Sequence, residues 1–138
     1  MNQMVDLVVF GGTGDLSTRK LLPSLYQLHR HGLSDRLHRI IATGRGDATT
    51  EVIRASAHAN LKKYLPPDDW DETVWEKFRD SLHYQKLDAN NKADYLSLGD
   101  QLNQNGAPTR LFYLATLPSL YGLICHHLQA QKVINADS

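Results

Sequence analysis

Apolar positions along the chain follow two alternating patterns, short continuous runs and stripes with helical spacing. The short runs, which stop at turn residues as buried strands do, occupy residues 7–10, 39–43 and 111–115, with a weaker one at 82–87. Between the first two runs, Leu21, Leu25 and Leu28 recur at steps of three and four, and Gly32 closes this stripe as a C-terminal cap would. The first part of the chain therefore predicts a strand, a helix and a second strand.

Four more helices are predicted from the same signals. They cover 49–64 before a Pro-Pro pair, 71–79 with acidic residues in the first turn, a stripe at 95–102 that ends at Asn105-Gly106, and a segment after Pro118. Strands that alternate with helices at this spacing predict βαβ units. The expected fold class is α/β, a Rossmann-like parallel sheet with helices on both faces, formed by one domain over residues 1–138.

Composition and charge narrow the classes of function. The chain has 138 residues, enough for one globular domain, and its 15 basic residues balance its 15 acidic ones. Without an overall positive field, we expect no binding to nucleic acid or to a membrane surface. The N-terminus has no secretory-signal pattern, so we expect a cytoplasmic protein. The single cysteine, Cys125, lies in a helical apolar pattern and is expected to be packed inside rather than reactive.

The stretch VVFGGTGDLS joins the first strand to the first helix through a glycine-rich turn. Such a turn points unpaired backbone N–H groups and the positive end of the helix dipole at one spot, which attracts phosphate. Gly11 suits a left-handed turn, Gly14 lets the backbone approach a pyrophosphate, and Ser17 is small enough for the helix to pack on the strand. The pattern predicts a nucleotide site, with a purely structural turn as the alternative.

Other patterns that bind phosphate, nucleotides or metals are missing from the sequence. No Gly-Lys-Ser or Gly-Lys-Thr follows the glycines, as a P-loop requires. No tyrosine stands four residues before a lysine, which argues against a short-chain dehydrogenase with its chemistry in this domain. The histidine pairs at 29 and 31 and at 126 and 127 diverge on their helices, so we expect no metal site.

The end of the second strand carries the residue that would choose between coenzymes. In dinucleotide-binding folds an acidic side chain there binds the ribose 2′-hydroxyl of NAD, whereas an arginine accommodates the 2′-phosphate of NADP. Arg45 follows the strand directly, and Asp47 lies two residues further on. Because a guanidinium forks onto phosphate with charge-assisted bonds, the sequence favours NADP, and Asp47 is the one argument for NAD.

Three blocks of the sequence match a known family in order and approximate spacing. FGGTGDLSTRKLLPSLYQLHRHGL, RIIATGR and RLFYLATLPSLYGLICHHL resemble the N-terminal coenzyme domain of the glucose-6-phosphate dehydrogenase family. The likeness covers nearly the whole chain, and the Asp-Leu pair followed by a proline is its most specific part. Because Pro23 cannot donate to the carbonyl of Arg19, the helix must bend or restart at this point.

The resemblance implies a role for a small set of residues. It assigns the coenzyme to Gly11, Gly12, Thr13, Gly14, Asp15, Leu16, Ser17, Thr18, Arg45, Asp88 and Tyr121. The 2′-phosphate falls to Arg45, and Asp88 and Tyr121 match positions that line the adenine and nicotinamide sides. Lys20 matches a family lysine near the coenzyme and the sugar phosphate, so it is the expected substrate contact.

The resemblance also implies an activity for a parent enzyme. The family oxidises glucose 6-phosphate with NADP to 6-phosphogluconolactone, in the oxidative pentose phosphate route. The family's catalytic histidine and sugar-binding domain are expected after Ser138, so this chain should hold no catalytic residue and should be inactive alone. A dehydrogenase-like NADP sensor without chemistry is the alternative. The oligomeric state stays open, and a homo-oligomer of the full-length enzyme is one option.

Overall fold

A parallel four-stranded sheet forms the middle of the molecule. The computed structural model describes residues 4–14, 16–33, 35–104 and 106–134. The strands are β1 (Val5–Phe10), β2 (Leu37–Gly44), β3 (Leu82–Lys86) and β4 (Thr109–Leu114). They lie in the order β3-β2-β1-β4, and every neighbouring pair is parallel. This confirms the predicted fold class, an α/β Rossmann-like sheet.

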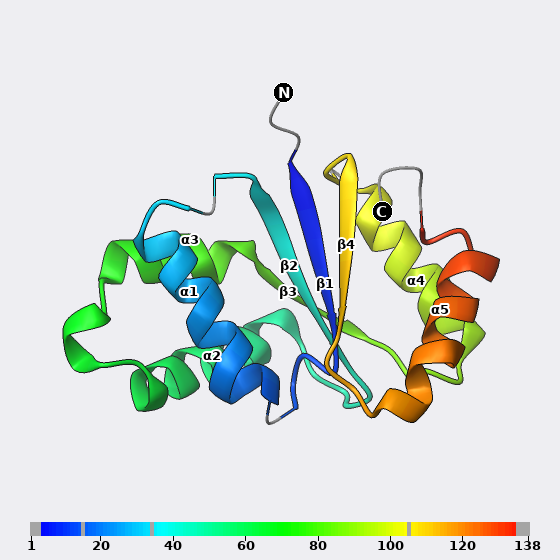
Figure 1. Cartoon of the computed structure of the whole chain (residues 1–138), viewed down its shortest axis with the longest axis horizontal. Coiled ribbons are helices and arrows are strands. Elements are labelled where there is room, and N and C mark those ends of the chain that lie inside the picture. Colours follow the sequence, from blue (N-terminus) through cyan, green and yellow to red (C-terminus); the bar gives the residue numbers. More distant parts are fainter. Residues whose placement is uncertain (1–3, 15, 34, 105, 135–138) are drawn as a thin grey trace.

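Helices cover both faces of this sheet, in two separate layers (Figure 1). One layer holds α1 (Leu22–Arg30), α2 (Thr50–Tyr64) and α3 (Glu72–Ser81), and the other holds α4 (Lys92–Asn103) and α5 (Tyr121–Ala130). Three short helical segments, η1 (Ser17–Leu21), η2 (Pro67–Asp69) and η3 (Pro118–Leu120), join these elements. The predicted helices are thus all present. No helix in the described ranges is both long and apolar enough to span a bilayer.

Each face of the sheet has its own apolar core. Alternate residues of β1 point to opposite faces, so Leu7 and Val9 pack under α1, α2 and α3, whereas Val8 and Phe10 pack under α4 and α5. We call these the first core and the second core. Because β1 is central and buried on both faces, its residues form a continuous apolar run instead of an alternating pattern.

The chain changes direction across the sheet after β3. The segments β1-α1-β2 and β2-α2-α3-β3 build outward on one side of β1, and α4 then carries the chain over the opposite face to β4 on the other side. At such a switch point the two adjacent loops leave in opposite directions, and a crevice opens between them at the carboxyl ends of the strands. The topology therefore predicts a ligand site beyond the ends of β1 and β4.

The first helix starts with a widened turn. In η1 the N–H of Leu22 donates to the carbonyl of Ser17, five residues back, which is a π-type bond. Pro23 follows one residue later and has no N–H to offer to Arg19, in line with the predicted bend or restart. The Ser24 hydroxyl donates to the carbonyl of Lys20 at 2.9 Å and so satisfies one acceptor in this distorted turn.

The structure departs from the sequence-based expectations at α5 and at β4. Cys125 was expected to be packed inside, but it is exposed on α5. The apolar run of β4 is at the sheet edge, where Leu111 is 56% and Tyr113 is 43% exposed. An apolar pattern reveals a strand, but it does not reveal whether both faces of that strand are covered.

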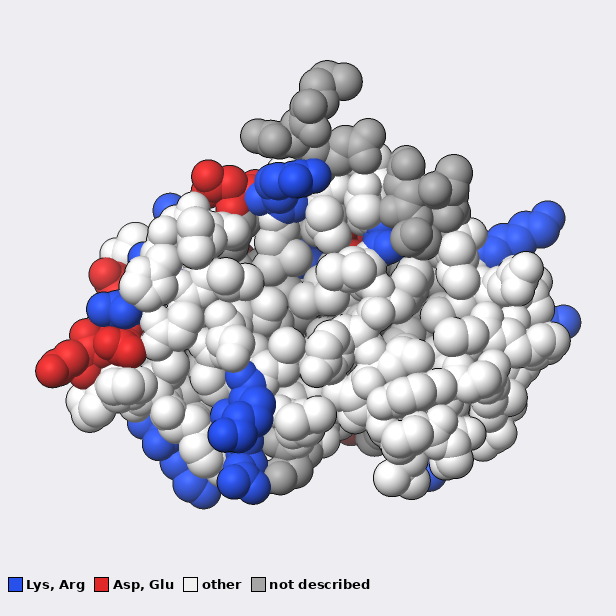
Figure 2. Space-filling view, viewed as in Figure 1, with Lys and Arg blue, Asp and Glu red and all other residues white. Residues whose placement is uncertain are grey.

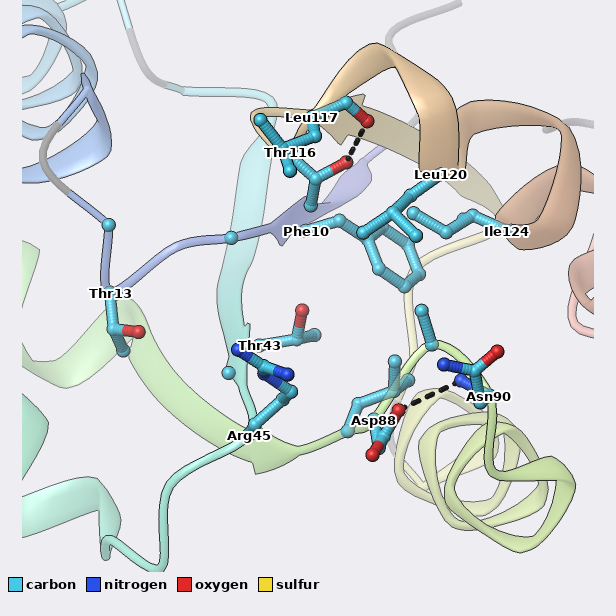
Figure 3. Close-up of a pocket in the computed structure, with 15 residues that line it drawn as sticks. Phe10, Thr13, Thr43, Arg45, Asp88, Asn90, Thr116, Leu117, Leu120 and Ile124 are labelled. Atoms are coloured by element: carbon cyan, nitrogen blue, oxygen red, sulfur yellow. Dashed lines mark hydrogen bonds between the residues drawn. The ribbon is translucent and has the colours of Figure 1, made fainter.

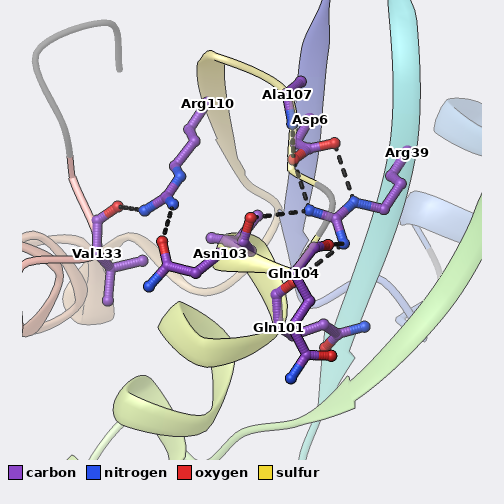
Figure 4. Close-up of polar contacts among 9 residues, drawn as sticks. Asp6, Arg39, Gln101, Asn103, Gln104, Ala107, Arg110 and Val133 are labelled. Carbon is purple, nitrogen blue, oxygen red and sulfur yellow. Dashed lines mark hydrogen bonds and ion pairs between the residues drawn. The ribbon is translucent and has the colours of Figure 1, made fainter.

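A buried polar network closes the amino end of the sheet (Figure 4). The fully buried carboxylate of Asp6 accepts from Arg39 Nε at 3.0 Å and Nη2 at 2.7 Å, and also from the N–H of Ala107 at 2.9 Å. The same guanidinium donates to the carbonyls of Gln101, Leu102 and Gln104 at the end of α4. Arg39 thus both neutralises Asp6 and caps the C-terminus of the crossover helix.

Candidate functional site

A cleft of about 470 Å³ crosses the carboxyl ends of the four strands (Figure 3). It is lined by the glycine turn, the end of β2, the β3–α4 loop and the segment after β4, namely by Phe10, Gly11, Thr13, Gly14, Thr43, Gly44, Arg45, Leu87, Asp88, Ala89, Asn90, Thr116, Leu117, Leu120 and Ile124. This is the position that the switch point predicts. Its size falls within the range of pockets that hold small ligands and cofactors.

The first two glycines of the turn are required by the packing beneath the cleft. Gly11 has a φ of +77°, and a Cβ there would lie 2.6 Å from the carbonyl oxygen of Ala115. A Cβ at Gly12 would lie 2.6 Å from the Cβ of Ala42. Gly12 is buried and its N–H donates to Thr43 at 2.9 Å, so it supports the turn from below.

Gly14 differs from these two because it faces open space. Its exposed backbone lines the cleft, and a Cβ there would meet only the Gly11 carbonyl oxygen, at 3.2 Å. That carbonyl accepts from the Gly14 N–H at 2.9 Å and from the Ser17 hydroxyl at 2.9 Å. Ser17 is 1% exposed, so a small residue is needed where the helix meets the turn. The turn thus keeps a bare backbone surface toward the cleft.

The remaining residues of the predicted loop lie around this turn. Thr13 lines the cleft, and Leu16 is exposed. Thr18 is half-buried, and its N–H donates to the carbonyl of Gly14 at 3.0 Å. Asp15 lies outside the described residues.

Arg45 enters the cleft from the end of β2, and its guanidinium points toward the open middle, between Thr13 and Asp88 (Figure 3). Asp47, two residues on, is absent from the cleft lining and forms an ion pair with Lys86 at the end of β3. The Lys86 ammonium holds the pKa of the Asp47 carboxyl below its usual value. The structure therefore brings the basic candidate to the cleft and pairs the acidic one elsewhere.

Asp88 lies on the opposite side of the cleft, in the loop that leads to α4. Its carboxylate accepts from the N–H of Asn90 at 2.9 Å (Figure 3). Its own N–H donates to the carboxylate of Asp94 at 2.8 Å. These local bonds fix the loop and keep Asp88 at the rim. Phe10, Leu120 and Ile124 form an apolar wall across the cleft from Asp88 (Figure 3).

A buried tyrosine supports this apolar wall. Tyr95 on α4 packs on Phe10 with ring centroids 6.4 Å apart, and its hydroxyl donates to the carbonyl of Ala89 at 3.0 Å. Burial is the main reason that the pKa of Tyr95 rises to about 12, so the hydroxyl stays protonated as a donor. Tyr95 therefore links the apolar wall, through Phe10, to the β3–α4 loop, through Ala89.

Besides Gly12, Leu16, Ser17 and Thr18 of the turn, two predicted residues are outside the cleft lining, Lys20 and Tyr121. Lys20 is exposed in η1, and Tyr121, at the start of α5, is 38% exposed. Figure 2 shows basic side chains over the start of α1, beside a hollow between the two helix layers that is lined mostly by uncharged side chains. Among the residues that the structure describes, His, Cys, Asp and Glu form no group of three that could hold a metal ion.

Sequence reasoning missed Tyr84, which is outside the cleft lining but contacts the loop that carries Arg45. Its hydroxyl lies 2.9 Å from the carbonyl oxygen of Gly44 and 2.6 Å from that of Gly46, the two residues that flank Arg45. Nothing in the local sequence signals this contact, because the partners are 40 and 38 residues apart. The period-two pattern of β3 places Tyr84 inward, and only the parallel pairing with β2 brings it to the loop.

A parallel sheet with this strand order, a glycine turn at the first helix and a cleft at the switch point define a dinucleotide-binding domain of the Rossmann type. The family model described as "Glucose-6-phosphate dehydrogenase, NAD binding domain" matches residues 8–138. The chain belongs to that family.

Curated relatives agree with this assignment. The chain is 37% identical to glucose-6-phosphate 1-dehydrogenase of Mycolicibacterium smegmatis, over 96% of this chain and 28% of that protein. It is 38% identical to the same enzyme of Dickeya dadantii, over 91% of this chain and 25% of that protein. The chain thus spans about a quarter of the length of these relatives. Both relatives are enzymes, which favours the dehydrogenase reading over a non-catalytic sensor.

Solved structures show the same fold. The crystal structure of glucose-6-phosphate 1-dehydrogenase from Mycobacterium avium superimposes with a TM-score of 0.85 at 25% identity, over 98% of this chain and 28% of that one. A glucose-6-phosphate dehydrogenase solved in complex with glucose 6-phosphate gives a TM-score of 0.82 at 25% identity, over 99% of this chain and 29% of that one.

Proposed function

We propose that this chain binds NADP, in preference to NAD, as the coenzyme domain of a cytoplasmic enzyme that oxidises glucose 6-phosphate to 6-phosphogluconolactone. The observation that carries the coenzyme choice is the position of Arg45 in the cleft while Asp47 is paired with Lys86. A carboxylate in that position would accept a ribose hydroxyl and repel a phosphate, whereas a guanidinium attracts the phosphate.

The residues of the cleft fit the parts of NADP. The open backbone at Gly14 offers the pyrophosphate a close approach, and Arg45 offers two parallel donors to the 2′-phosphate. In this proposal Asp88, at the rim, contacts the adenosine side, and the apolar wall at Leu120 and Ile124 packs against a ring of the coenzyme. When bound, the nicotinamide would accept the hydride from the sugar.

The share of this chain in the reaction is to hold and orient the coenzyme. Holding the nicotinamide in one place against the sugar lowers the entropic part of the barrier. We propose Lys20, on the exposed surface of η1, as a contact to the sugar phosphate, and Tyr121 as a contact on the nicotinamide side. The base that takes the hydroxyl proton, and most contacts to the sugar, belong in this proposal to a further domain of the parent enzyme.

Titration calorimetry with NADP and NAD tests the proposal on the purified chain. Arg45→Ala should weaken NADP binding by about tenfold, the effect expected for an exposed charge-assisted contact, and should leave NAD binding within about twofold. Arg79→Ala removes a partly exposed arginine on α3, outside the cleft lining, and serves as the matched control. An equal loss of both coenzymes in Arg45→Ala would overturn the assignment of the 2′-phosphate to Arg45.

Two further measurements address the rest of the proposal. Gly14→Val should abolish binding of both coenzymes in a folded chain, because the side chain would fill the approach to the turn. With glucose 6-phosphate and NADP at saturation, the 138-residue chain should form no NADPH above the level of that variant. Turnover by the wild-type chain alone would show that the catalytic base lies within these residues.

A further inference from the structure

The segment that carries Arg45 is intrinsically loose. Arg45 stands between Gly44 and Gly46, and a Cβ at Gly46 would meet nothing within 4 Å. Glycine has more backbone freedom to lose than any other residue, so a Gly-Arg-Gly segment left alone would sample many directions for the guanidinium. A contact from outside that holds this segment would therefore lower the entropic cost of binding a phosphate through Arg45.

Strand β3 supplies that contact through Tyr84. Tyr84 is 8% exposed and pairs with Ala42 of β2. Its hydroxyl lies 2.9 Å from the Gly44 carbonyl oxygen and 2.6 Å from the Gly46 carbonyl oxygen. The Tyr84 hydroxyl thus bridges the Gly44–Arg45 peptide and the Gly46–Asp47 peptide, and so holds the two ends of the loop together.

The surroundings keep the hydroxyl in place. The N–H of Leu87 donates to the same Gly44 carbonyl at 2.8 Å, and Lys86 pairs with Asp47 one residue beyond the loop. A Cβ at Gly44 would lie 2.7 Å from Thr13 Oγ1 and 3.2 Å from the Tyr84 hydroxyl oxygen. Gly44 therefore lies close to both the glycine turn and Tyr84. Burial raises the pKa of Tyr84, and the group therefore remains a proton donor at neutral pH.

We propose that Tyr84 is a positioning residue for Arg45, and that its hydroxyl contributes to the preference for NADP over NAD without contacting either coenzyme. This rests on the proposed function, because it requires Arg45 to bind the 2′-phosphate. By fixing the backbone of the loop before the ligand arrives, Tyr84 lowers the entropic cost of ordering Arg45 at binding. NAD has no phosphate at that position, so its affinity does not depend on this order.

Tyr84→Phe removes only the hydroxyl and keeps the ring in the sheet. We expect NADP binding to weaken roughly threefold to tenfold, the range for one hydrogen bond, while NAD binding changes less than about twofold. The quantity to report is the ratio of the two dissociation constants on the same preparation, because a partly unfolded sample lowers both affinities and leaves this ratio unchanged. Tyr26→Phe is the matched control: that hydroxyl accepts from the Asp71 N–H at 2.8 Å, away from the cleft lining, so its loss should lower stability and leave the ratio unchanged.

The double variant Tyr84→Phe/Arg45→Ala separates positioning from a general structural role. If Tyr84 acts through Arg45, adding Tyr84→Phe to Arg45→Ala should not weaken NADP further. An equal fold loss in both backgrounds, or an equal loss of NADP and NAD in the single variant, would overturn the inference. If Arg45→Ala itself leaves NADP binding unchanged, the proposed function has failed instead.

Discussion

Three glycines of this domain differ in a way that separates backbone strain from steric overlap. Gly11 has a positive φ and no room for a Cβ, because the Ala115 carbonyl oxygen would be 2.6 Å away. Gly32 has a φ of +69° and nothing within 4 Å, so only strain applies there. Gly14 has no positive φ, and its nearest atom would be the Gly11 carbonyl oxygen at 3.2 Å.

The alanine variants should therefore lose stability in a fixed order. Strain alone costs about 1–2 kcal/mol, so Gly32→Ala should lower the unfolding free energy by that amount. Gly11→Ala adds an overlap that forces the end of β4 to move, typically about 1–3 kcal/mol, for a total of about 2–5 kcal/mol. Gly14→Ala should change it by less than about 1 kcal/mol, because alanine also restricts the unfolded chain. Against a typical total of about 5–15 kcal/mol, these differences are large enough to measure.

Urea unfolding followed by tryptophan fluorescence measures all three, since both tryptophans, Trp70 and Trp75, belong to the first core or pack against it. The difference between Gly11→Ala and Gly32→Ala isolates the overlap with Ala115. If Gly11→Ala costs no more than Gly32→Ala, or if Gly14→Ala costs as much as Gly11→Ala, the close approach of the turn to the end of β4 is refuted.

Three other changes test the rest of the structure. Arg39→Met leaves the fully buried Asp6 carboxylate without its cation and should cost about 3–5 kcal/mol in urea unfolding; a loss below about 1 kcal/mol would contradict the buried pair. Asp71→Ala removes the cap that accepts from Thr73 and Val74 at the start of α3 and should cost about 1 kcal/mol, with Asp71→Asn as the retaining control. Burial, with a smaller effect of nearby Arg54, lowers the pKa of His83 below its usual 6.5, so the unfolded chain binds more protons and stability falls as pH drops through that range. His83→Gln should make the unfolding free energy, measured with urea, fall less steeply between about pH 8 and 5 than in the wild-type chain. An unchanged pH dependence would contradict this role of His83.

The sequence predicted those features that depend on neighbours along the chain. The run at 7–10, the stripe of Leu21, Leu25 and Leu28 and the caps that bound the helices each carry their own local signal, and the structure has the corresponding strand and helices. The glycine turn was predictable for the same reason, because its spacing and its strand–turn–helix context are both local.

Features that depend on pairing across the sheet were not predictable. Tyr84 reads as one more inward residue of a weak strand, and its contact with Gly44 and Gly46 exists only because β3 lies parallel to β2 in one register. Likewise, Asp6 and Arg39 are 33 residues apart, and a single acid before an apolar run gives no indication that it is buried. The roles of Lys20 and Tyr121 stay predictions from the family resemblance.

The ion pair of Asp6 and Arg39 has a consequence for how this domain can change. It closes the amino ends of the strands, whereas Arg45, Tyr84 and the glycine turn meet at their carboxyl ends. The buried pair and the residues proposed to contact the coenzyme therefore lie at opposite ends of the strands and share no residue. Coenzyme preference should be open to redesign by substitutions around Arg45 and Asp47 in a library that leaves Asp6 and Arg39 fixed, with little loss of folded protein among its members.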